Sequence, residues 1–286
     1  MTAWIDRQQT LQELARSQLF FVGGAPRSGT TWLQSLLDCH PDVSCQGEGL
    51  FEKHLANPLD ALLASRAKAL GEKNRSVFGH GGGYAPPGPE ENDHLLATAI
   101  LLALARQTGG APYRAVGEKT PENVFFFDRL RQLFPAAKFV GIARDPRDVL
   151  TSAWHFFHKA AGGEDEIAAK TAFIHSAIPS LAAGAHTMLD LAKRYEKDCF
   201  IVTYETMNAN PDSAATRLFR FLGVAADSAI VADCVARTAF PTASAGDGSF
   251  FRKGVAGDWR STLTPAMNDT ILHDLGWMFP AFGWTP

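Results

Sequence analysis

The chain has 286 residues, of which 46% are hydrophobic and 20% are charged, and its formal net charge is -3. A chain of this length and composition can bury a full core, and we expect one domain over residues 1–286. The small negative charge gives no global positive field, so nucleic acid is not an expected partner and any anion site has to be built locally.

The N-terminal segment, MTAWIDRQQTLQELARSQ, is polar and helix-like, without the basic-then-apolar order of a secretory signal. The longest apolar stretch, residues 95–105, is about half of the roughly 20 residues that a membrane span needs. The four cysteines, Cys39, Cys45, Cys199 and Cys234, form no CxxC pair and have no metal-ligand spacing. We therefore expect a cytoplasmic protein with free thiols, no bound metal and no membrane partner.

Four short apolar runs predict buried strands in chain order, at residues 19–22, 114–117, 138–143 and 199–204. Helix-like segments alternate with them, at residues 31–38, 91–106, 125–134, 148–159, 167–197 and 213–222. This alternation predicts an α/β domain with a parallel sheet that helices cover on both faces. Ligands of such sheets bind at the carboxyl ends of the strands, where this sequence places polar clusters at 24–31, 118–122 and 144–148.

Three loops rich in glycine, alanine or proline interrupt this pattern, at residues 78–89, 160–166 and 241–248. Loops of this kind are either lids over a site or ordinary surface connections, and the sequence leaves both open.

The segment GGAPRSGTTW, residues 23–32, follows the first predicted strand. A glycine-rich turn from a strand into a helix directs backbone N-H groups and the positive helix end at one point, which favours an anion. The spacing from Gly24 to Gly29 is that of the phosphate-binding loop GxxxxGK[ST], but Thr30 stands in place of the lysine and Arg27 supplies the cation instead. Such a loop is poorly suited to γ-phosphoryl transfer but suits the 5' phosphate of a nucleotide.

PRSGTTW followed by LQSLLDCHPDV resembles the 5'-phosphosulfate loop of sulfotransferases that use 3'-phosphoadenosine 5'-phosphosulfate (PAPS). The resemblance implies a P-loop nucleotide-kinase-like sulfotransferase fold, with PAPS as donor and 3'-phosphoadenosine 5'-phosphate (PAP) as product. It also implies that the loop residues contact the donor, namely Arg27, Ser28, Gly29, Thr30 and Thr31, with Trp32 stacked on the adenine.

KFVGIARDPRDVLTSAWHFFH, residues 138–158, resembles the element that binds the 3' phosphate in this family. The resemblance implies that Arg144 and Ser152 hold this phosphate. The physical chemistry agrees, because Arg144 ends a predicted strand and a planar guanidinium binds phosphate bidentately. The alternative is a purely structural turn of RDxRD ion pairs.

FFRKGVAGDWRSTLTPAMND, residues 250–269, is similar to the RKGxxGDW loop of cytosolic sulfotransferases. In that family the loop closes over the nucleotide, which implies contacts from Arg252, Lys253 and Gly254. Residues 260–269 also resemble, with substitutions, a short dimer motif of cytosolic members, so both a monomer and a homodimer stay open.

RTAF, residues 237–240, resembles a stretch that contacts the adenine. The resemblance implies contacts from Thr238 and Phe240, although core packing is an equal alternative for Phe240. Tyr204, at the end of the fourth predicted strand, is assigned to the same nucleotide site.

Sulfuryl transfer needs a base for the acceptor hydroxyl and cations for the departing phosphate. Cytosolic members acting on small phenols and steroids carry a base histidine in a KTH motif, but here Pro121 follows Lys119 and Thr120. Tyrosylprotein and glycosaminoglycan sulfotransferases carry a glutamate shortly after HPD, and HPDVSCQGEGLFEKH places Glu48 there. The resemblance thus implies Glu48 as the base, with Lys119 and Arg27 as the cations. The rival carboxylates are Glu118, Glu52 and Glu122.

Aromatic residues flank the motifs and favour a small apolar or aromatic alcohol as acceptor, namely Phe51, Tyr84, Phe156, Phe157, Phe250 and Phe251. His155 and His158 lie beside Ser152 in the sequence and could line the same pocket. We therefore expect a small-molecule hydroxyl acceptor. Peptide tyrosine and carbohydrate hydroxyls remain alternatives, as do a P-loop kinase and a nucleotide-binding module without catalysis.

Overall fold

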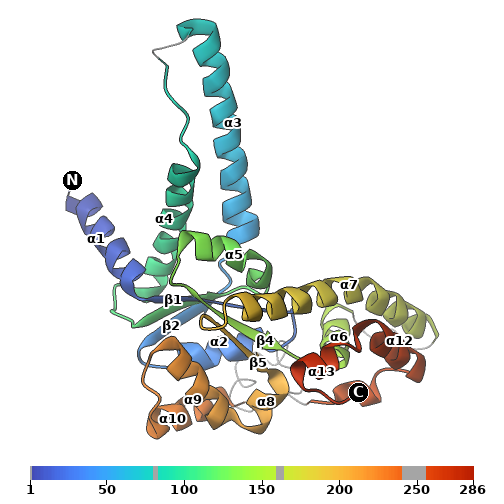
Figure 1. Cartoon of the computed structure of the whole chain (residues 1–286). Coiled ribbons are helices and arrows are strands. Elements are labelled where there is room, and N and C mark those ends of the chain that lie inside the picture. The colour runs from blue at the N-terminus through green and yellow to red at the C-terminus, as the bar shows by residue number, and fades with distance from the viewer. Residues whose placement is uncertain (1, 80–82, 159–163, 240–255) are drawn as a thin grey trace.

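The computed structural model describes residues 2–79, 83–158, 164–239 and 256–286. Its centre is a five-stranded sheet with the order β2-β3-β1-β4-β5, and all four strand pairings are parallel. The strands are β1 (Gln18–Gly24), β2 (Val43–Gly47), β3 (Ala115–Lys119), β4 (Lys138–Ala143) and β5 (Cys199–Thr203). Helices lie on both faces of the sheet, which confirms the predicted α/β fold (Figure 1).

The four predicted strands are β1, β3, β4 and β5, whereas β2 is an additional strand that the sequence pattern did not indicate. β2 lies at the edge of the sheet, and the residues at its carboxyl end, Gln46 and Gly47, are exposed. An edge strand with a polar end has no continuous apolar run, so the pattern for a central strand missed it.

The helices before β4 are α1 (Thr2–Arg16), α2 (Thr30–Asp38), α3 (Asn57–Lys73), α4 (Pro89–Thr108) and α5 (Asn123–Leu133). Those after β4 are α6 (Pro146–Phe157), α7 (Glu164–Arg194), α8 (Tyr204–Ala209), α9 (Pro211–Leu222), α10 (Ser228–Thr238), α12 (Pro265–Leu275) and α13 (Met278–Phe282). Short π-helical turns, Glu52–Ala56 and Asn74–Phe78, adjoin the two ends of α3, and a 3-10 turn spans Asp258–Ser261. The six predicted helices correspond to α2, α4, α5, α6, α7 and α9.

Alternating residues of the central strand divide the core into two layers, as the period of a strand requires. Phe20 and Val22 of β1 pack with α2, α8, α9 and α10 on one face of the sheet. Leu19 and Phe21 pack with α1, α4, α5 and α7 on the other face. A third cluster, away from the sheet, joins α6, α7, α12 and α13.

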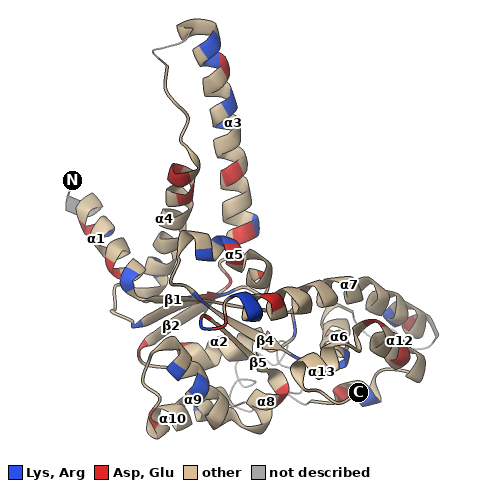
Figure 2. Cartoon of the chain, in the orientation of Figure 1, with Lys and Arg blue, Asp and Glu red and all other residues tan. Residues whose placement is uncertain are grey.

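The helix α3, together with the start of α4, projects from the domain as an arm (Figure 1). Leu63 is the one residue of α3 that is buried, and the rest of its surface carries charges of both signs (Figure 2). Its leucine and alanine residues are otherwise exposed or half-buried, and the sequence analysis predicted no element here.

The C-terminal segment is fixed to the turn after β4 by one buried arginine. Arg147 is 2% exposed and donates to both carboxylate oxygens of Asp145, at 2.7 Å and 3.0 Å, and to the Thr285 carbonyl at 3.0 Å. Its guanidinium also lies 4.0 Å from the centre of the Trp259 ring and 4.6 Å from that of Phe279. In the RDxRD turn, Arg147 therefore forms the structural ion pair that the sequence analysis gave as the alternative to a phosphate contact.

We expect Arg147→Ala to lower the free energy of unfolding by about 3–5 kcal/mol, because the Asp145 carboxylate would stay buried without its cation. Urea denaturation would measure the loss. The matched control is Arg194→Ala, because Arg194 pairs with Asp128 on the surface and its side chain is 40% exposed. That variant should lose no more than about 1 kcal/mol. Equal losses in the two variants would contradict the assignment.

Candidate functional site

The glycine-rich loop connects β1 to α2 and is fitted against the ends of β4 and β5. Gly29 precedes α2 with a left-handed φ of 102°, and a Cβ atom there would lie 2.8 Å from Cδ2 of Tyr204. The buried Ser28 hydroxyl donates to the Ile142 carbonyl at 3.2 Å. A glycine is required at position 29 both by the backbone conformation and by the neighbouring ring.

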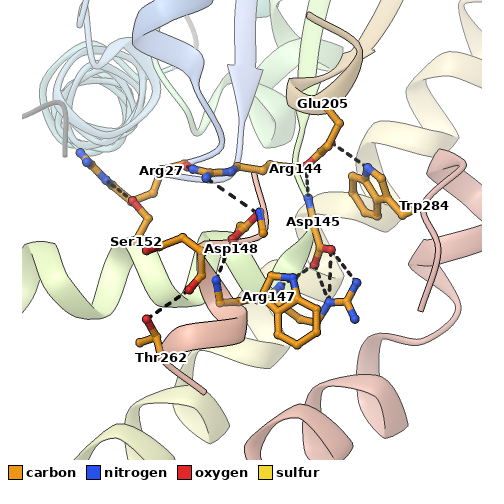
Figure 3. A network of polar contacts seen from close by, with 12 residues as sticks. Arg27, Arg144, Asp145, Arg147, Asp148, Ser152, Glu205, Thr262 and Trp284 are labelled. Atoms are coloured by element: carbon orange, nitrogen blue, oxygen red, sulfur yellow. Dashed lines mark hydrogen bonds and ion pairs between the residues drawn. The ribbon is translucent and has the colours of Figure 1, made fainter. Parts of the chain in front are cut away.

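Three predicted nucleotide-binding residues come together from separate elements beside this loop (Figure 3). Arg27 lies in the loop, Arg144 directly follows β4, and Ser152 belongs to α6. Arg27 donates from Nε to the Ser152 hydroxyl at 3.4 Å, and Arg144 donates to the Arg27 carbonyl at 3.3 Å. Two guanidinium groups are thus assembled where a helix begins, which is a favourable arrangement for an anion.

Aromatic rings orient both arginines. The guanidinium of Arg27 lies 4.4 Å from the centre of the Phe156 ring, and that of Arg144 lies 4.3 Å from the centre of the Tyr204 ring. Such contacts stabilise a cation through the negative face of the ring. Burial raises the pKa of the Tyr204 hydroxyl, while the charge of Arg144 opposes that shift.

Asp148 is a residue of this region that sequence reasoning missed. It is 2% exposed, lies 4.0 Å from Nη2 of Arg144, and accepts from the backbone N-H of Gly257 at 2.6 Å and of Trp259 at 3.1 Å. It therefore joins Arg144, directly after β4, to the backbone of Gly257 and Trp259. The repeated RD of RDPRD was the available signal, but the spacing alone does not tell which aspartate has which partner.

The predicted base and the predicted lysine are in direct contact. Glu48 follows β2 directly, and Gly47 of β2 is the register partner of Lys119 at the end of β3. Nζ of Lys119 lies 2.6 Å from Oε1 of Glu48. The Lys119 side chain is 5% exposed and that of Glu48 is 41% exposed, so the carboxylate faces solvent while the ammonium is enclosed.

The rival carboxylates are placed differently. Glu118 is 3% exposed, and its carboxylate is bound by Gly49, Thr120 and Asn123 rather than by Lys119. Burial raises its pKa, although these hydrogen bonds act in the opposite direction. Glu122 is exposed at the start of α5, and Glu52 begins the turn after Phe51.

The remaining predicted nucleotide contacts are only partly described. Trp32 meets the Tyr204 ring edge to face at 5.4 Å between centres. Thr238 ends α10, is buried, and donates its hydroxyl to the Cys234 carbonyl at 2.7 Å. Thr30 is buried and Thr31 half-buried in the first turn of α2. Four predicted residues lie outside the described residues, namely Phe240, Arg252, Lys253 and Gly254.

Of the aromatic residues expected around the acceptor, Phe156 and Phe157 meet edge to face at 5.0 Å between ring centres on the exposed end of α6, and the other described members lie elsewhere. Phe51 is buried in the core, Tyr84 is 83% exposed beyond the tip of α3, and Phe156 lies against Arg27. His158 stacks on Trp154 at 4.1 Å between ring centres. Phe250 and Phe251 lie outside the described residues. The argument for an apolar acceptor from these residues therefore loses its basis.

Residues 20–228 match the model of the family described as "Sulfotransferase family". The chain belongs to the sulfotransferase family. The predicted family is confirmed, and with it the preference for a sulfotransferase over a P-loop kinase.

Two curated relatives of this sulfotransferase are a putative protein-tyrosine sulfotransferase of Caenorhabditis briggsae and protein-tyrosine sulfotransferase 1 of Homo sapiens. The first is 28% identical over 205 residues, which cover 72% of this chain and 65% of the relative. The second is 33% identical over 129 residues, which cover 45% and 32%. The chain thus spans less than two thirds of the length of these relatives.

Among solved structures, a mouse sulfotransferase complexed with PAP aligns with a TM-score of 0.60 and 16% identity, over 95% of this chain and 88% of that one. This likeness confirms the predicted fold. No helix in the described ranges is long and apolar enough to span a bilayer. No group of three or more His, Cys, Asp or Glu side chains suited to a metal ion occurs among the same residues.

Two expectations change with these findings. The cytoplasmic location is wrong, because it rested on the absence of a leader and of a spanning helix, whereas the relatives are protein-tyrosine sulfotransferases that extend well beyond the matched region. The acceptor prediction holds only at the level of a sulfotransferase acceptor. The names of the relatives favour the alternative of peptide tyrosine over a small apolar molecule.

We expect Gly29→Ala to lower the free energy of unfolding by about 1–3 kcal/mol from backbone strain, with an additional loss from overlap with the Tyr204 ring. Gly109→Ala is the matched control, because Gly109 also has a positive φ but a Cβ atom there would meet nothing within 4 Å. Urea denaturation of both variants separates strain from overlap. A larger loss in the control would contradict the fit of Gly29 against Tyr204.

Proposed function

We propose that the chain transfers the sulfuryl group of PAPS to the phenolic hydroxyl of tyrosine in a peptide or protein, with Glu48 as the base. The main support is the contact of Glu48 with Lys119 at 2.6 Å, at the same carboxyl-terminal side of the sheet as Arg27 of the glycine-rich loop and Arg144 after β4. The sulfotransferase family match supports the reaction, and the names of the curated relatives support the acceptor class.

The residues present fit the two phosphate ends of the donor. The turn at Gly29 and the N-terminus of α2 offer backbone N-H groups to a 5' phosphate, and Arg27 adds a positive charge. Arg144 and Ser152 lie on the neighbouring elements, which suits the 3' phosphate. When bound, PAPS supplies an electrophilic sulfuryl group on a phosphate leaving group. Thr238 and Trp32, on the packed helices α10 and α2, remain candidates for the adenine.

The chain's own groups divide the acid-base and electrostatic work. The Glu48 carboxylate is exposed enough to meet an acceptor and takes the proton of its hydroxyl. The ammonium of Lys119, beside it, offsets the negative charge that develops on the departing phosphate, together with Arg27. Because Lys119 contacts Glu48 directly, the base and the cation are positioned by one interaction.

A protein acceptor agrees with the exposure of the base. Glu48 follows an edge strand, and the residues from Gln46 to Leu50 are all exposed. A tyrosine side chain carried by a large partner reaches such a carboxylate without entering a deep cavity. Phe51 is buried in the core, Tyr84 is 83% exposed and Phe156 lies against Arg27, so these residues give no argument for a small apolar alcohol.

Arg144→Ala should weaken the affinity for PAP roughly 10- to 100-fold, because a charge-assisted hydrogen bond contributes about 1.5 to 3 kcal/mol. Isothermal titration calorimetry without magnesium would measure the dissociation constant. Arg220→Ala removes an exposed arginine of α9 and should bind PAP as the unchanged protein does. Unaltered affinity in the Arg144 variant would remove it from the nucleotide site.

Glu48→Gln should lower kcat by roughly 10²- to 10⁴-fold, the usual range for a general base, while PAP still binds. The assay follows transfer of labelled sulfuryl from PAPS to a peptide with one tyrosine, with a phenylalanine peptide and a simple phenol as comparisons. Glu52→Gln, at the start of the neighbouring turn, is the control and should keep its activity. Full turnover by the Glu48 variant would exclude it as the base, and a preference for the phenol would exclude a peptide acceptor.

A further inference from the structure

Glu118 is a buried carboxylate beside the candidate site that the proposed reaction does not use. It is the penultimate residue of β3, next to Lys119, and only 3% of it is exposed. Successive side chains of a strand point to opposite faces, so Glu118 and Lys119 project in different directions although they are neighbours. A buried carboxylate costs much free energy unless it is well bonded, so its partners indicate what it is there to hold.

All described hydrogen-bond partners of the Glu118 carboxylate are donors. The backbone N-H of Gly49 donates to Oε1 at 2.6 Å, and Nδ2 of Asn123 donates to Oε2 at 2.8 Å. The Thr120 hydroxyl also contacts Oε1. Because that hydroxyl accepts from the N-H of Leu50 at 3.3 Å, its own hydrogen is directed at Glu118. The arrangement therefore suits the ionised carboxylate.

The two backbone groups held in this way belong to the residues directly after Glu48. Gly49 is bound by Glu118 itself, and Leu50 is bound through Thr120. The fit is close, since a Cβ atom on Gly49 would lie 3.2 Å from Cγ of Glu118 and 2.7 Å from the Phe51 ring. The backbone directly after Glu48 is thus held by Glu118 and Thr120, while the Glu48 carboxylate itself is held by Lys119.

The same cluster reaches the glycine-rich loop. Nδ2 of Asn123 donates not only to Glu118 but also to the Val22 carbonyl of β1 at 3.1 Å. The Pro121 carbonyl, two residues earlier, accepts from the N-H of Gly24 at 3.0 Å. The Val22 carbonyl of β1 is therefore connected to the backbone of Gly49 through the side chains of Asn123 and Glu118.

We propose that Glu118 is a positioning residue, whose buried carboxylate holds the backbone of Gly49 and Leu50 and so fixes the Glu48 carboxylate beside Lys119. This inference rests on the proposed role of Glu48 as the base. Glu118 touches no reacting atom in this assignment and acts through Glu48. A displacement of a reacting group by about 1 Å costs up to 10²-fold in rate, so loss of the clamp is measurable.

The pH dependence of the clamp has a defined sign. Burial raises the pKa of Glu118, so protonation of the native state begins at a higher pH than for an ordinary glutamate. The carboxylate that accepts from Gly49 is thus lost as the pH falls through the raised pKa. The free energy of unfolding has the opposite pH dependence. The native state binds this proton more readily than the unfolded chain does, so the contribution of Glu118 to stability is present at low pH and is lost as the pH rises through the raised pKa.

The first test is Glu118→Gln, which keeps the size of the side chain but removes the negative charge that strengthens the hydrogen bonds from Gly49 and Thr120, and turns the oxygen facing Asn123 into a donor. We expect kcat for the tyrosine peptide to fall about 10- to 100-fold, with the dissociation constant of PAP changed by less than about threefold. Glu122→Gln is the matched control, since it makes the same chemical change at an exposed position four residues away. Equal kcat in the two variants would overturn the inference.

A double-mutant cycle distinguishes positioning from an independent effect. If Glu118 acts through Glu48, the Glu48→Gln, Glu118→Gln double variant should be no slower than Glu48→Gln alone. Multiplied losses would overturn the inference while leaving Glu48 as the base. Full activity of Glu48→Gln would instead overturn the proposed base, so the two failures are distinguishable.

Thr120 provides a second route should Glu118→Gln fold poorly. Thr120→Val removes the hydroxyl that links Leu50 to Glu118 at nearly constant size, and kcat should fall several-fold at unchanged PAP affinity. Thr120→Ser restores the hydroxyl and should recover most of that loss. An equal loss of kcat in the valine and serine variants would show that the hydroxyl holds nothing relevant to turnover, and would overturn the clamp.

Discussion

Lys119 is aligned with Val22 on one side and with Gly47 on the other, and this parallel register decides which chemical groups meet. Glu48 comes immediately after Gly47, and the glycine-rich loop comes immediately after β1. On the far side of β1, Gly24 is aligned with Ile142, two residues before Arg144. All strands of a parallel sheet have their carboxyl ends on the same side. A lysine, a carboxylate and two arginines from distant parts of the sequence are therefore brought to that side of the sheet.

The side of the sheet that is formed by the carboxyl ends of the strands carries more buried charge than the rest of the core. Glu118, Lys119, Arg147 and Asp148 are each at most 4% exposed. Buried charges are tolerated when they are paired or hydrogen bonded, and each of these four is bound by described groups. Because the bonds of Glu118, Lys119 and Asp148 each join different segments of the chain, and Arg147 also binds the Thr285 carbonyl, the charges also fix the relative positions of these segments. Stability and positioning on this side of the sheet therefore have the same physical origin.

The sequence predicted β1, β3, β4 and β5, the main helices and the glycine-rich loop, because apolar runs and glycine spacing are local signals. It did not predict β2, although β2 places Glu48, because an edge strand with exposed Gln46 and Gly47 lacks a continuous apolar pattern. It also could not separate Glu48 from Glu118. The two carboxylates differ in burial, because the side chain of Glu48 is 41% exposed whereas the residue Glu118 is 3% exposed. Burial depends on contacts with β2 and α5, which no local pattern encodes.

The two arginines of RDPRD show the same limit at the anion site. Arg147 is bound along its edge by Asp145 and the Thr285 carbonyl, and its faces lie against two aromatic rings, so its charge is neutralised within the core. Arg144, three residues earlier, is oriented by the face of Tyr204, with Asp148 4.0 Å away. Arg147 is thus paired bidentately with Asp145, whereas Arg144 is oriented by a ring and shares Asp148 with the backbone N-H groups of Gly257 and Trp259. Arg27 lies on the Phe156 ring in the same way, so both arginines that the proposed function assigns to the donor in place of the loop lysine are oriented by aromatic rings.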